Sequence, residues 1–549
     1  MADTDDRNQP AGRPLWSVLL FTVLGTLLPG LGLIVAGWRK VGSVILVLTL
    51  AAVAVLGVRV GADPIGAIGT ALGPGVLTGI VVGAVVVGIG WAVLVVCTYR
   101  ALRPAGDSPG HRAVMAAVVG VLCLLVLAPT SYAAQLGYTT QRTVDTIFGS
   151  GGPSATVPTG PAAAGAAANP WTDKPRVNVL ILGGDAGPTS GGGIRQGVRT
   201  DSVVVASIDT HTGNTVLISV ARNTQRLQFQ PGTPLARVYP AGYSSPQSEN
   251  LLNSIYDDLP VAYPGLLGKT EDEGADALKL GLGYSLFGSA SAIDYYVLVS
   301  LTGFEQVVSA LGGVTVNVNE PVADGGEFEQ GVKNVLPRRW IMPGLNQHLD
   351  GRNVEWFSRG RYGTDDYARL RRQRCTINAI ANQASPAKVL ASYQSLADTA
   401  ANVTRTDIRR DVLPAMVTLG ETVRRSGTLS SLAVDQVGIR GFDQFHPDWD
   451  QVRALVRLAI SRSVATRKRA TAPTAATPAP SSTATRPSPT PLLSTPRSTP
   501  TPSPSRTPAA TIEPDLNQTC AYDPVAAAAA LATWKRDYGW AFDDNGNRR

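Results

Sequence analysis

Cysteine and histidine, the side chains that hold most zinc sites, are scarce in this chain, with four of each among 549 residues. No two of them stand at the short spacing that a zinc site requires, which argues against a zinc-binding module. Four cysteines are also too few for a disulfide-rich scaffold. The chemistry of this protein must therefore rest on other side chains.

Apolar residues are scarce in one long region, residues 464–512, where Pro, Thr, Ser and Ala dominate. Such a composition cannot build a core, so we expect a disordered linker there. Small residues in 137–174 predict a second, flexible linker. The last segment, 513–549, regains aromatic side chains and could therefore dock on another part of the protein: Trp534, Tyr538, Trp540 and Phe542.

Long apolar runs, in contrast, fill the first part of the chain, at about 15–37, 41–60, 75–98 and 112–135. Each is close to the roughly 20 residues with which a helix crosses a bilayer. A cleaved signal peptide does not explain four such runs. We therefore expect four transmembrane helices within residues 15–136, and a multi-pass protein of the cell membrane.

Positive charge orients these helices, because short loops that carry Lys and Arg stay on the cytoplasmic side. The loop after the first run carries Arg39 and Lys40, and the loop after the third run carries three arginines. Both loops are predicted inside, which places the tail 1–14 and everything after about residue 136 outside. Nucleotides are scarce there, so a phosphate-binding site would meet lipid-linked phosphates, and its basic residues would not serve nucleic acid.

The same topology divides the cysteines into two pairs. Cys97 and Cys123 lie within predicted spans, as ordinary small apolar residues do. Cys375 and Cys520 lie outside, where disulfides persist. They form either a disulfide, which would pin the C-terminal segment beside an arginine-rich helix, or two free thiols, and the residues alone leave both readings open.

The most informative run is WFSRGRYGTDDYARLRRQRC, residues 356–375, with six arginines and two adjacent aspartates. A guanidinium group can hold a phosphate through two hydrogen bonds at once. Six of them close together favour a multiply anionic ligand among them. The alternative is a solvated basic surface, which is the usual interpretation of a charge run.

The spacing within the run predicts two arginine-bearing faces. On an extended segment, Arg359 and Arg361 would project to the same side. The adjacent aspartates favour the start of a helix. Three residues of that helix would share one face, at spacings of three and four: Arg369, Arg372 and Gln373.

Periodicity predicts the architecture of the domain that carries this run, residues 175–463. Apolar runs between turn residues predict strands at 177–183, 202–208, 215–221, 293–299 and 314–318. Helices are expected at 248–258, 272–287 and 301–311, and they dominate from residue 366 onward. Strands mixed with helices indicate an α/β or α+β sandwich with a central mixed sheet flanked by helices.

Polar side chains stand at the ends of the first three predicted strands. Asp185 follows the first strand, Arg199 and Asp201 precede the second, and Arg222 and Arg226 follow the third. Mg²⁺ prefers carboxylate and phosphate oxygens, and arginines can take the remaining phosphate oxygens. The set therefore suits a divalent metal beside a diphosphate, although a salt bridge or turn cap is the alternative for an Arg-x-Asp motif.

The order of these motifs resembles the LytR–CpsA–Psr family over about residues 175–390. The matching segments are NVLILGGD, RTDSVVVASID, TVLISVARNT, ENLLNSIY, IDYYVLVSLTGFEQVVSALGGVTVNV, PGLNQHLDGRNVEWFSRGR and DDYARLRRQ. Members of that family are membrane-anchored bacterial phosphotransferases that act outside the cytoplasm. The resemblance implies a hydrophobic channel for a lipid tail. It also implies that a glycopolymer moves from a polyprenyl diphosphate carrier to peptidoglycan, with Mg²⁺ or Mn²⁺, forming a phosphodiester.

The resemblance also assigns roles to residues of this chain. Asp185 and Asp201 match the metal-associated aspartates. The residues expected to bind the pyrophosphate are Arg199, Arg222, Arg226, Arg359, Arg361, Arg369 and Gln373, and those expected to be catalytic are Asp185, Asp201, Arg222 and Arg369. The other arginines of the run, Arg371 and Arg374, would face solvent or support the fold.

Some features depart from the family pattern. Asn223 stands where the family has an Asp that could orient Arg222, and four predicted spans replace the single N-terminal span that is common in the family. The glycine-rich loop after Asp185 offers Arg195 as an additional phosphate contact. None of these departures removes the aspartate pair or the arginines, so we expect an active enzyme.

Two other functions remain compatible with the same residues. A polyprenyl diphosphate pyrophosphatase would use water in place of the glycan acceptor. A non-catalytic sensor would bind wall or lipid without turnover. A transcriptional role finds little support, because no DNA-binding element is visible on the predicted cytoplasmic side.

Overall fold

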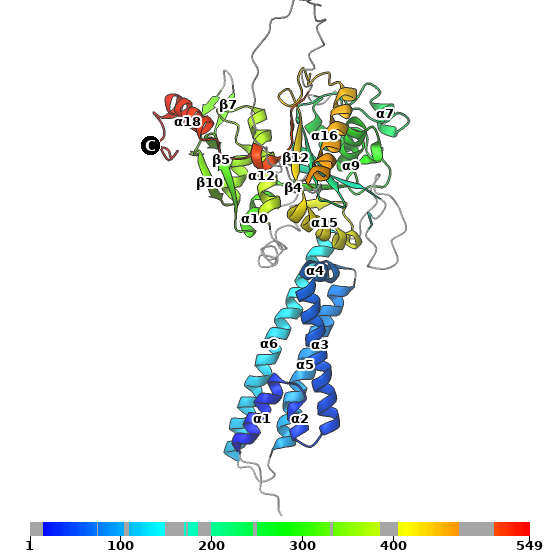
Figure 1. Ribbon diagram of the computed structural model, residues 1–549, viewed down its shortest axis with the longest axis vertical. Helices are drawn as coiled ribbons and strands as arrows, with labels where there is room; N and C mark the ends of the chain where they lie inside the picture. Colours follow the sequence, from blue (N-terminus) through cyan, green and yellow to red (C-terminus); the bar gives the residue numbers. More distant parts are fainter. Residues whose placement is uncertain are drawn as a thin grey trace, which may run out of the picture.

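The computed structural model is an elongated molecule in which a bundle of helices carries an α/β domain at one end (Figure 1). It describes residues 15–73, 75–103, 109–148, 170–171, 174–184, 199–244, 250–329, 333–384, 404–470 and 510–549. Several features predicted from the sequence lie outside these residues: Asp185, Arg195, the tail 1–14 and most of both linkers.

Three helices in the described part of the chain are long and apolar enough to cross a membrane, by length and composition. They are α3 (Arg39–Ala62), α5 (Val76–Leu102) and α6 (Pro109–Ile147). The short helix α4 (Pro64–Leu72) connects α3 to α5 at the end of the bundle that meets the α/β domain (Figure 1). These helices correspond to the last three of the four predicted spans.

The first predicted span, residues 15–37, does not form one crossing helix. α1 (Leu15–Leu27) has 13 residues, and after a turn with Gly30 at φ 98° the chain continues as the short helix α2 (Leu31–Val35). A helix of this length spans about 20 Å, less than the roughly 30 Å of a bilayer core. The prediction of four spans is therefore not confirmed.

The two short helices enter the bundle and return to the same end. Val18 of α1 and Val35 of α2 pack in one cluster with Leu102 and Met115, at the end far from the α/β domain. Deeper in the bundle, the indole nitrogen of Trp91 donates to the carbonyl of Thr26 at 3.0 Å. The prediction that the tail 1–14 lies outside assumed four crossings. With three, the start of α1 lies at the end that carries the positively charged loops.

A mixed seven-stranded sheet forms the centre of the α/β domain, in the order β11–β4–β1–β2–β3–β12–β13. β4 is parallel to β1 and β12 is parallel to β3, whereas the other neighbouring pairs are antiparallel. The strands are β1 (Arg176–Gly184), β2 (Thr200–Asp209), β3 (Thr215–Val220), β4 (Tyr295–Ser300), β11 (Thr404–Thr406), β12 (Leu429–Val434) and β13 (Ile512–Glu513).

Helices cover both faces of this sheet, since successive side chains of a strand point to opposite faces. Val203 and Val205 pack with the first helical layer, and Val204 and Ala206 with the second. The first layer is η1 (Leu252–Ser254), α8 (Ile255–Ala262), α9 (Glu273–Leu282) and α16 (Trp449–Ala470), with the shorter α7 (Pro234–Val238), η2 (Gly283–Phe287) and η3 (Ala290–Ala292). The second is α12 (Asp366–Gln383), η4 (Arg410–Val412), α15 (Leu413–Ser426) and α17 (Leu516–Thr519).

A smaller lobe lies beside the sheet and has its own apolar cluster, which includes Val316 of β5 and Phe357 of α11. Its strands form the pairs β5–β10, β6–β9 and β7–β8. The elements are α10 (Leu301–Ala310), β5 (Val314–Val318), β6 (Val322–Asp324), β7 (Glu327–Glu329), β8 (Lys333–Val335), β9 (Arg339–Ile341), β10 (Gly344–Leu349) and α11 (Gly351–Arg359).

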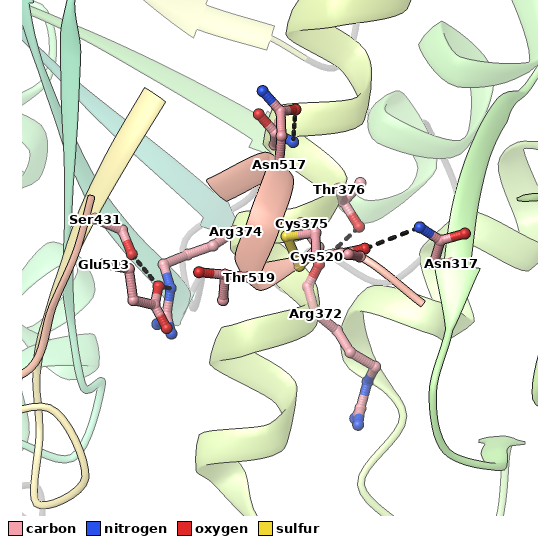
Figure 2. The surroundings of a disulfide bond; sticks show 12 residues. Asn317, Arg372, Arg374, Cys375, Thr376, Ser431, Glu513, Asn517, Thr519 and Cys520 are labelled. Atoms are coloured by element: carbon pink, nitrogen blue, oxygen red, sulfur yellow. Dashed lines mark hydrogen bonds and ion pairs between the residues drawn. A yellow bond between two sulfur atoms is a disulfide. The ribbon is translucent and has the colours of Figure 1, made fainter. Parts of the chain in front are cut away.

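The C-terminal segment, residues 510–549, packs back onto the α/β domain. Its strand β13 pairs with β12, and Cys520, directly after α17, forms a disulfide with Cys375 of α12 (Figure 2). Its helix α18 (Pro524–Tyr538) lies against the smaller lobe (Figure 1). The two cysteines that the sequence left as a disulfide or as free thiols are thus bonded in the structure.

The α/β domain sits directly on the helix bundle. Leu77 and Val144 of the bundle pack with Ile408 and Leu413 of the domain, and Arg410 forms an ion pair with Asp145. The contact joins α15 to α4 and to the end of α6 (Figure 1). The α/β domain therefore lies at one end of the helices α3, α5 and α6, which could cross a membrane.

Candidate functional site

The site lies at one edge of the sheet, where strand ends of opposite direction meet. β2 is antiparallel to both β1 and β3, so its start lies beside their ends, with Thr200 paired to Gly184 and Val203 to Val220. Asp201 on β2 therefore lies next to Arg222, which follows β3. This placement results from strand order and could be predicted once the hairpin from β2 to β3 was assigned.

Asp201 and Arg222 form the first contact of the site. Arg222 Nη1 donates to Asp201 Oδ1 at 2.6 Å, and Asn253 Nδ2 donates to the same oxygen at 3.2 Å. Asn223, which replaces the family's aspartate, pairs instead with Gln444 at 2.8 Å. Arg222 thus keeps a carboxylate partner in spite of that substitution.

Asp366, at the start of α12, joins the second half of the site to the first. Its carboxylate lies 2.9 Å from Arg369 Nη2, 3.8 Å from Arg222 Nε and 3.8 Å from Arg361 Nη1. From the sequence, this residue was expected only to mark the start of a helix. That signal is correct for its neighbour, since Asp365 caps α12 by accepting from the Ala368 backbone N–H at 2.7 Å. Only the fold showed that Asp366 turns toward three arginines.

A cleft of about 1420 Å³ opens over these groups. Of the predicted site residues, Asp201, Arg359, Arg361, Arg369 and Gln373 line it. Arg359 stacks on the ring of Trp356, with 4.8 Å between the guanidinium carbon and the ring centroid, and pairs with Glu355 at 2.8 Å. The cleft thus brings the strand-end aspartate and much of the arginine run together in one place.

The segment that carries Arg359 and Arg361 is not extended as expected. Arg359 is the last residue of α11, which ends at Gly360, and Arg361 follows in the loop to α12. Arg372 holds this loop, because its guanidinium donates to the carbonyls of Phe357 and Gly360 from inside the protein. Arg372 is therefore a structural residue and not part of the cleft wall.

Arg369 is the most unusual cation of the site. It is 3% exposed, and its Nε has no hydrogen-bond partner among the described residues. Burial lowers the pKa of Arg369 to about 10, because desolvation outweighs the attraction of Asp366. A buried cation with an unused N–H is costly unless an anion completes its contacts. Gln373, one turn further along α12, has a buried Oε1 that finds no hydrogen-bond partner in the described part of the chain.

The carboxyl of Asp201 is held in its charged form. Burial by itself would raise the pKa of Asp201, but the charge and hydrogen bond of Arg222, with smaller effects of Arg369 and Asn253, keep that pKa below 3.8. A carboxylate that loses its proton so easily is a weak base near neutral pH. It is better suited to binding a cation.

Oxygen ligands for a hard cation are present around Asp201. Asn253 donates to Asp201, and its own Oδ1 is buried without a hydrogen-bond partner among the described residues. Among the residues that the structure describes, no group of three or more His, Cys, Asp or Glu side chains is placed to hold a metal ion. Mg²⁺ commonly takes only one or two carboxylates and completes its shell with water and phosphate oxygens, so this donor set fits Mg²⁺.

The remaining predicted residues do not all line the cleft. Arg199 is exposed one residue before β2, and Arg226 has a φ of 53° after β3; neither lines the cleft. Arg371 pairs with Glu320 at 3.3 Å on the rim. Arg374 does not face solvent: it is 6% exposed and lines the cleft beside Glu513.

Comparison with known proteins identifies the family. The model of the LytR_cpsA_psr family matches residues 154–457, and the chain belongs to this family. It is 26% identical over 251 residues to a polyisoprenyl-teichoic acid–peptidoglycan teichoic acid transferase TagU of Oceanobacillus iheyensis, covering 45% of this chain and 64% of that protein. It is likewise 26% identical over 253 residues to TagU of Enterococcus faecalis, covering 44% and 64%.

The chain therefore spans slightly less than two thirds of the length of these curated relatives. Among solved structures, it is similar to that of Bacillus subtilis TagV. The TM-score is 0.33 and the identity 20%, over 52% of this chain and 97% of that one.

Proposed function

We propose that this protein is a phosphotransferase that moves a glycopolymer from a polyprenyl diphosphate carrier to peptidoglycan, forming a phosphodiester. The observation that carries the proposal is the buried Arg369, which lines a cleft together with Asp201 and four further arginines. Its Nε has no hydrogen-bond partner among the described residues. Such a cleft is complementary to a diphosphate. The named activity of the relatives, transfer of teichoic acid from a polyisoprenyl carrier, supports the same class of reaction.

In this proposal the phosphates lie between the two halves of the site. Arg369 and Arg361 bind them from the α11–α12 side, and Arg222 from the end of β3. These arginines now share the two carboxylates Asp201 and Asp366. When substrate binds, phosphate oxygens would replace some of these carboxylate contacts. The guanidinium groups would then stabilise the charge that moves to the leaving phosphate.

Mg²⁺ is the cofactor that this donor set fits best, with Mn²⁺ as a substitute. Asp201 and Asn253 Oδ1 would hold it, together with Asp185, whose role as second ligand is carried over from the family motif. When bound, the ion supplies positive charge that offsets the phosphate oxygens during transfer.

The proposed transfer needs no reagent besides the carrier-linked glycopolymer and peptidoglycan. A sugar hydroxyl of peptidoglycan forms a bond to the phosphorus that carries the glycopolymer, and the bond from that phosphorus to the bridging oxygen breaks. Polyprenyl phosphate leaves with the electron pair, and the hydroxyl proton passes to a carboxylate. Asp201 is a poor acceptor for that proton because its pKa is lowered, so its proposed role is metal binding.

The cellular setting follows from the same proposal. The α/β domain lies outside the cytoplasm, held on helices α3, α5 and α6 that could span the membrane. The lipid tail of the carrier would remain in or near the bilayer, and an apolar channel for it stays a prediction from the family resemblance. Peptidoglycan is then the acceptor partner.

The test uses the full-length protein in liposomes with a radiolabelled glycopolymer on a polyprenyl diphosphate, Mg²⁺, and purified peptidoglycan. We expect label on the peptidoglycan together with released polyprenyl phosphate. Release without any glycan product would show a pyrophosphatase instead. Stoichiometric binding without turnover would show a sensor, and either result would contradict the proposal.

A further inference from the structure

One wall of the cleft is built by residues outside the part of the chain that matches the family. Thr511, Glu513 and Tyr538 line the cleft, whereas the family match ends at residue 457. They belong to the segment 510–549, which follows the Pro-rich linker. The C-terminal segment therefore extends the cleft beyond the residues proposed to bind phosphate.

Three attachments hold the segment in place. β13 pairs with β12 through Leu432 and Ile512, and Cys520 is bonded to Cys375 on the same helix as Arg369 (Figure 2). Asn317 Nδ2 of β5 donates to the carbonyl of Cys520 at 3.0 Å. The segment thus contacts the sheet, the arginine-bearing helix and the smaller lobe, and Glu513 and Tyr538 occupy defined positions.

Glu513 faces Arg374 across this wall (Figure 2). Its Oε2 lies 3.6 Å from Arg374 Nε and also accepts a hydrogen bond from Ser431 Oγ. Arg374 is 6% exposed, and its Nε and Nη1 have no hydrogen-bond partner among the described residues. Arg374 lines the cleft, so a polar ligand there can use the hydrogen-bonding capacity that the ion pair with Glu513 leaves open.

Tyr538 forms the other end of the wall. Its ring packs on Trp340, with centroids 5.0 Å apart, and on Tyr362 at 5.8 Å. Its hydroxyl is close to Gly363, where an added Cβ would lie 3.2 Å from it. The α11–α12 loop with Arg361 therefore ends against this tyrosine, and the phenol edge borders the cleft.

The chemistry of this wall differs from that of the phosphate half. Glu513 offsets the charge of Arg374, and Asp435, which is 2% exposed, adds a second carboxylate to the lining. Carboxylate acceptors, guanidinium and phenol donors and an aromatic edge together match the hydroxyl groups of a neutral sugar.

We propose that residues 510–549 form a sugar-binding subsite of the cleft, in which Glu513, Arg374 and Tyr538 contact a saccharide next to the diphosphate. This inference rests on the proposed function, since it takes the diphosphate as the neighbouring group. The saccharide is either the first sugar of the lipid-linked donor or a sugar of the glycan acceptor.

Binding of three probes to the full-length protein separates the possibilities. Farnesyl diphosphate carries no sugar, farnesyl diphospho-N-acetylglucosamine carries a donor-like sugar, and a β-1,4-linked N-acetylglucosamine tetramer stands for the acceptor. The variants are Glu513→Gln and Tyr538→Phe, which keep size and packing. The matched control is Asp544→Asn, on the same segment but 81% exposed and paired with Lys535.

We expect each variant to weaken at least one sugar probe by about 5- to 10-fold, as the loss of one hydrogen bond to a charged or buried group would. Farnesyl diphosphate should bind unchanged, and Asp544→Asn should alter no probe. Weakening of the farnesyl-linked sugar assigns the subsite to the donor, and weakening of the tetramer assigns it to the acceptor.

Other outcomes overturn the inference. These are unchanged affinity for both sugar probes in both variants, equal weakening of farnesyl diphosphate, or a wild-type protein that binds neither sugar probe. Failure of the wild type to bind farnesyl diphosphate, with sugar binding intact, would contradict the proposed function and not the sugar subsite.

Discussion

Arg369 illustrates how a single residue can carry the function of a site. The protein buries its guanidinium almost completely, and one N–H group has no hydrogen-bond partner within the described ranges of the chain. Stability alone would favour an apolar residue in such a position. The cost is understandable if a phosphate completes the contacts of Arg369 during the reaction.

Replacing Arg369 by Ala should therefore reduce transfer by at least about 100-fold, as removal of one preorganised donor to a charged transition state does. Arg369→Lys should recover only part of the loss, because an ammonium group does not bind phosphate through a planar fork. The measurement is the rate of glycopolymer transfer by the full-length protein in liposomes.

The matched control for Arg369 is Arg425→Ala, which removes a guanidinium that is 66% exposed on α15. Transfer by this variant should equal that of the wild type. Wild-type transfer by Arg369→Ala would show that the buried guanidinium serves the fold and not the phosphates.

The lowered pKa of Asp201 makes a prediction about stability at acid pH. In the folded protein, the pKa of Asp201 lies below the ordinary value of an aspartate, 3.8, which we take for the unfolded chain. Its charged form therefore stabilises the fold above pH 3.8, and this contribution is lost as pH falls through the folded pKa. As the pH is lowered from about 5 to about 2, the thermal midpoint of Asp201→Asn should consequently fall less than that of the wild type.

Calorimetry of both proteins across that range tests the expectation, with Asp450→Asn as a control because Asp450 is 91% exposed. Parallel pH profiles of wild type and Asp201→Asn would show that Arg222 and Asn253 do not hold the carboxylate in its charged form.

At the scale of elements, the site depends on how segments that are distant in the sequence are joined. β2 and β3 bring Asp201 to Arg222, and α12 brings Asp366 and Arg369 to both. The middle of α12 is held by the disulfide between Cys375 and Cys520, which closes a sequence separation of 145 residues.

Removing that disulfide in the double variant Cys375→Ser, Cys520→Ser should destabilise the α/β domain by about 2–5 kcal/mol, because the unfolded chain loses a long-loop constraint. The apparent melting temperature should fall, and reducing agent should lower that of the wild type in the same way. Cys97→Ser, which changes a free cysteine, should not respond to reductant differently from the wild type. Equal melting of all three proteins would contradict the prediction.

Periodicity predicted the five strands β1–β5 because each is an apolar run between turns. It missed β12, which reads Leu-Ser-Ser-Leu-Ala-Val and is buried throughout. Its serines fit a crowded interior where Ser430 bonds to the carbonyl of Thr215 and Ser431 to Glu513. Because those partners come from β3 and β13, no local sequence pattern predicts this strand.

At the scale of the whole molecule, the structure favours three membrane crossings where the sequence predicted four. The side of the membrane on which each loop lies was predicted from its positive charge. In the structure, α1 and α2 enter and leave the bundle at one end. The α/β domain lies at the opposite end (Figure 1). With three crossings, the start of α1 is expected on the cytoplasmic side.

Cysteine labelling tests this topology in a variant in which Cys97 and Cys123 are replaced by Ala. A cysteine introduced as Trp16→Cys, at a position that is 69% exposed, should react with a membrane-impermeant maleimide only after the cells are opened. A cysteine introduced as Phe445→Cys, on the α/β domain and 48% exposed, should react in intact cells. Labelling of both positions in intact cells would restore the prediction of four spans.

The sequence by itself determined the features that depend on local composition and order. These are the apolar helices, the charge that orients them, the central strands, the arginine run and the family to which the motifs point. Each can be read within a window of neighbouring residues, because hydrophobic periodicity and loop charge act over short distances.

Only the tertiary structure decided which of these residues meet. It turned Asp366 toward three arginines, buried Arg369 and Arg374, placed Glu513 in the cleft and folded α1 back on α2. These outcomes depend on packing between segments that are far apart in the chain. The contact of Glu513 with Arg374, for example, spans the whole Pro-rich linker, and no spacing in the sequence encodes such a pair.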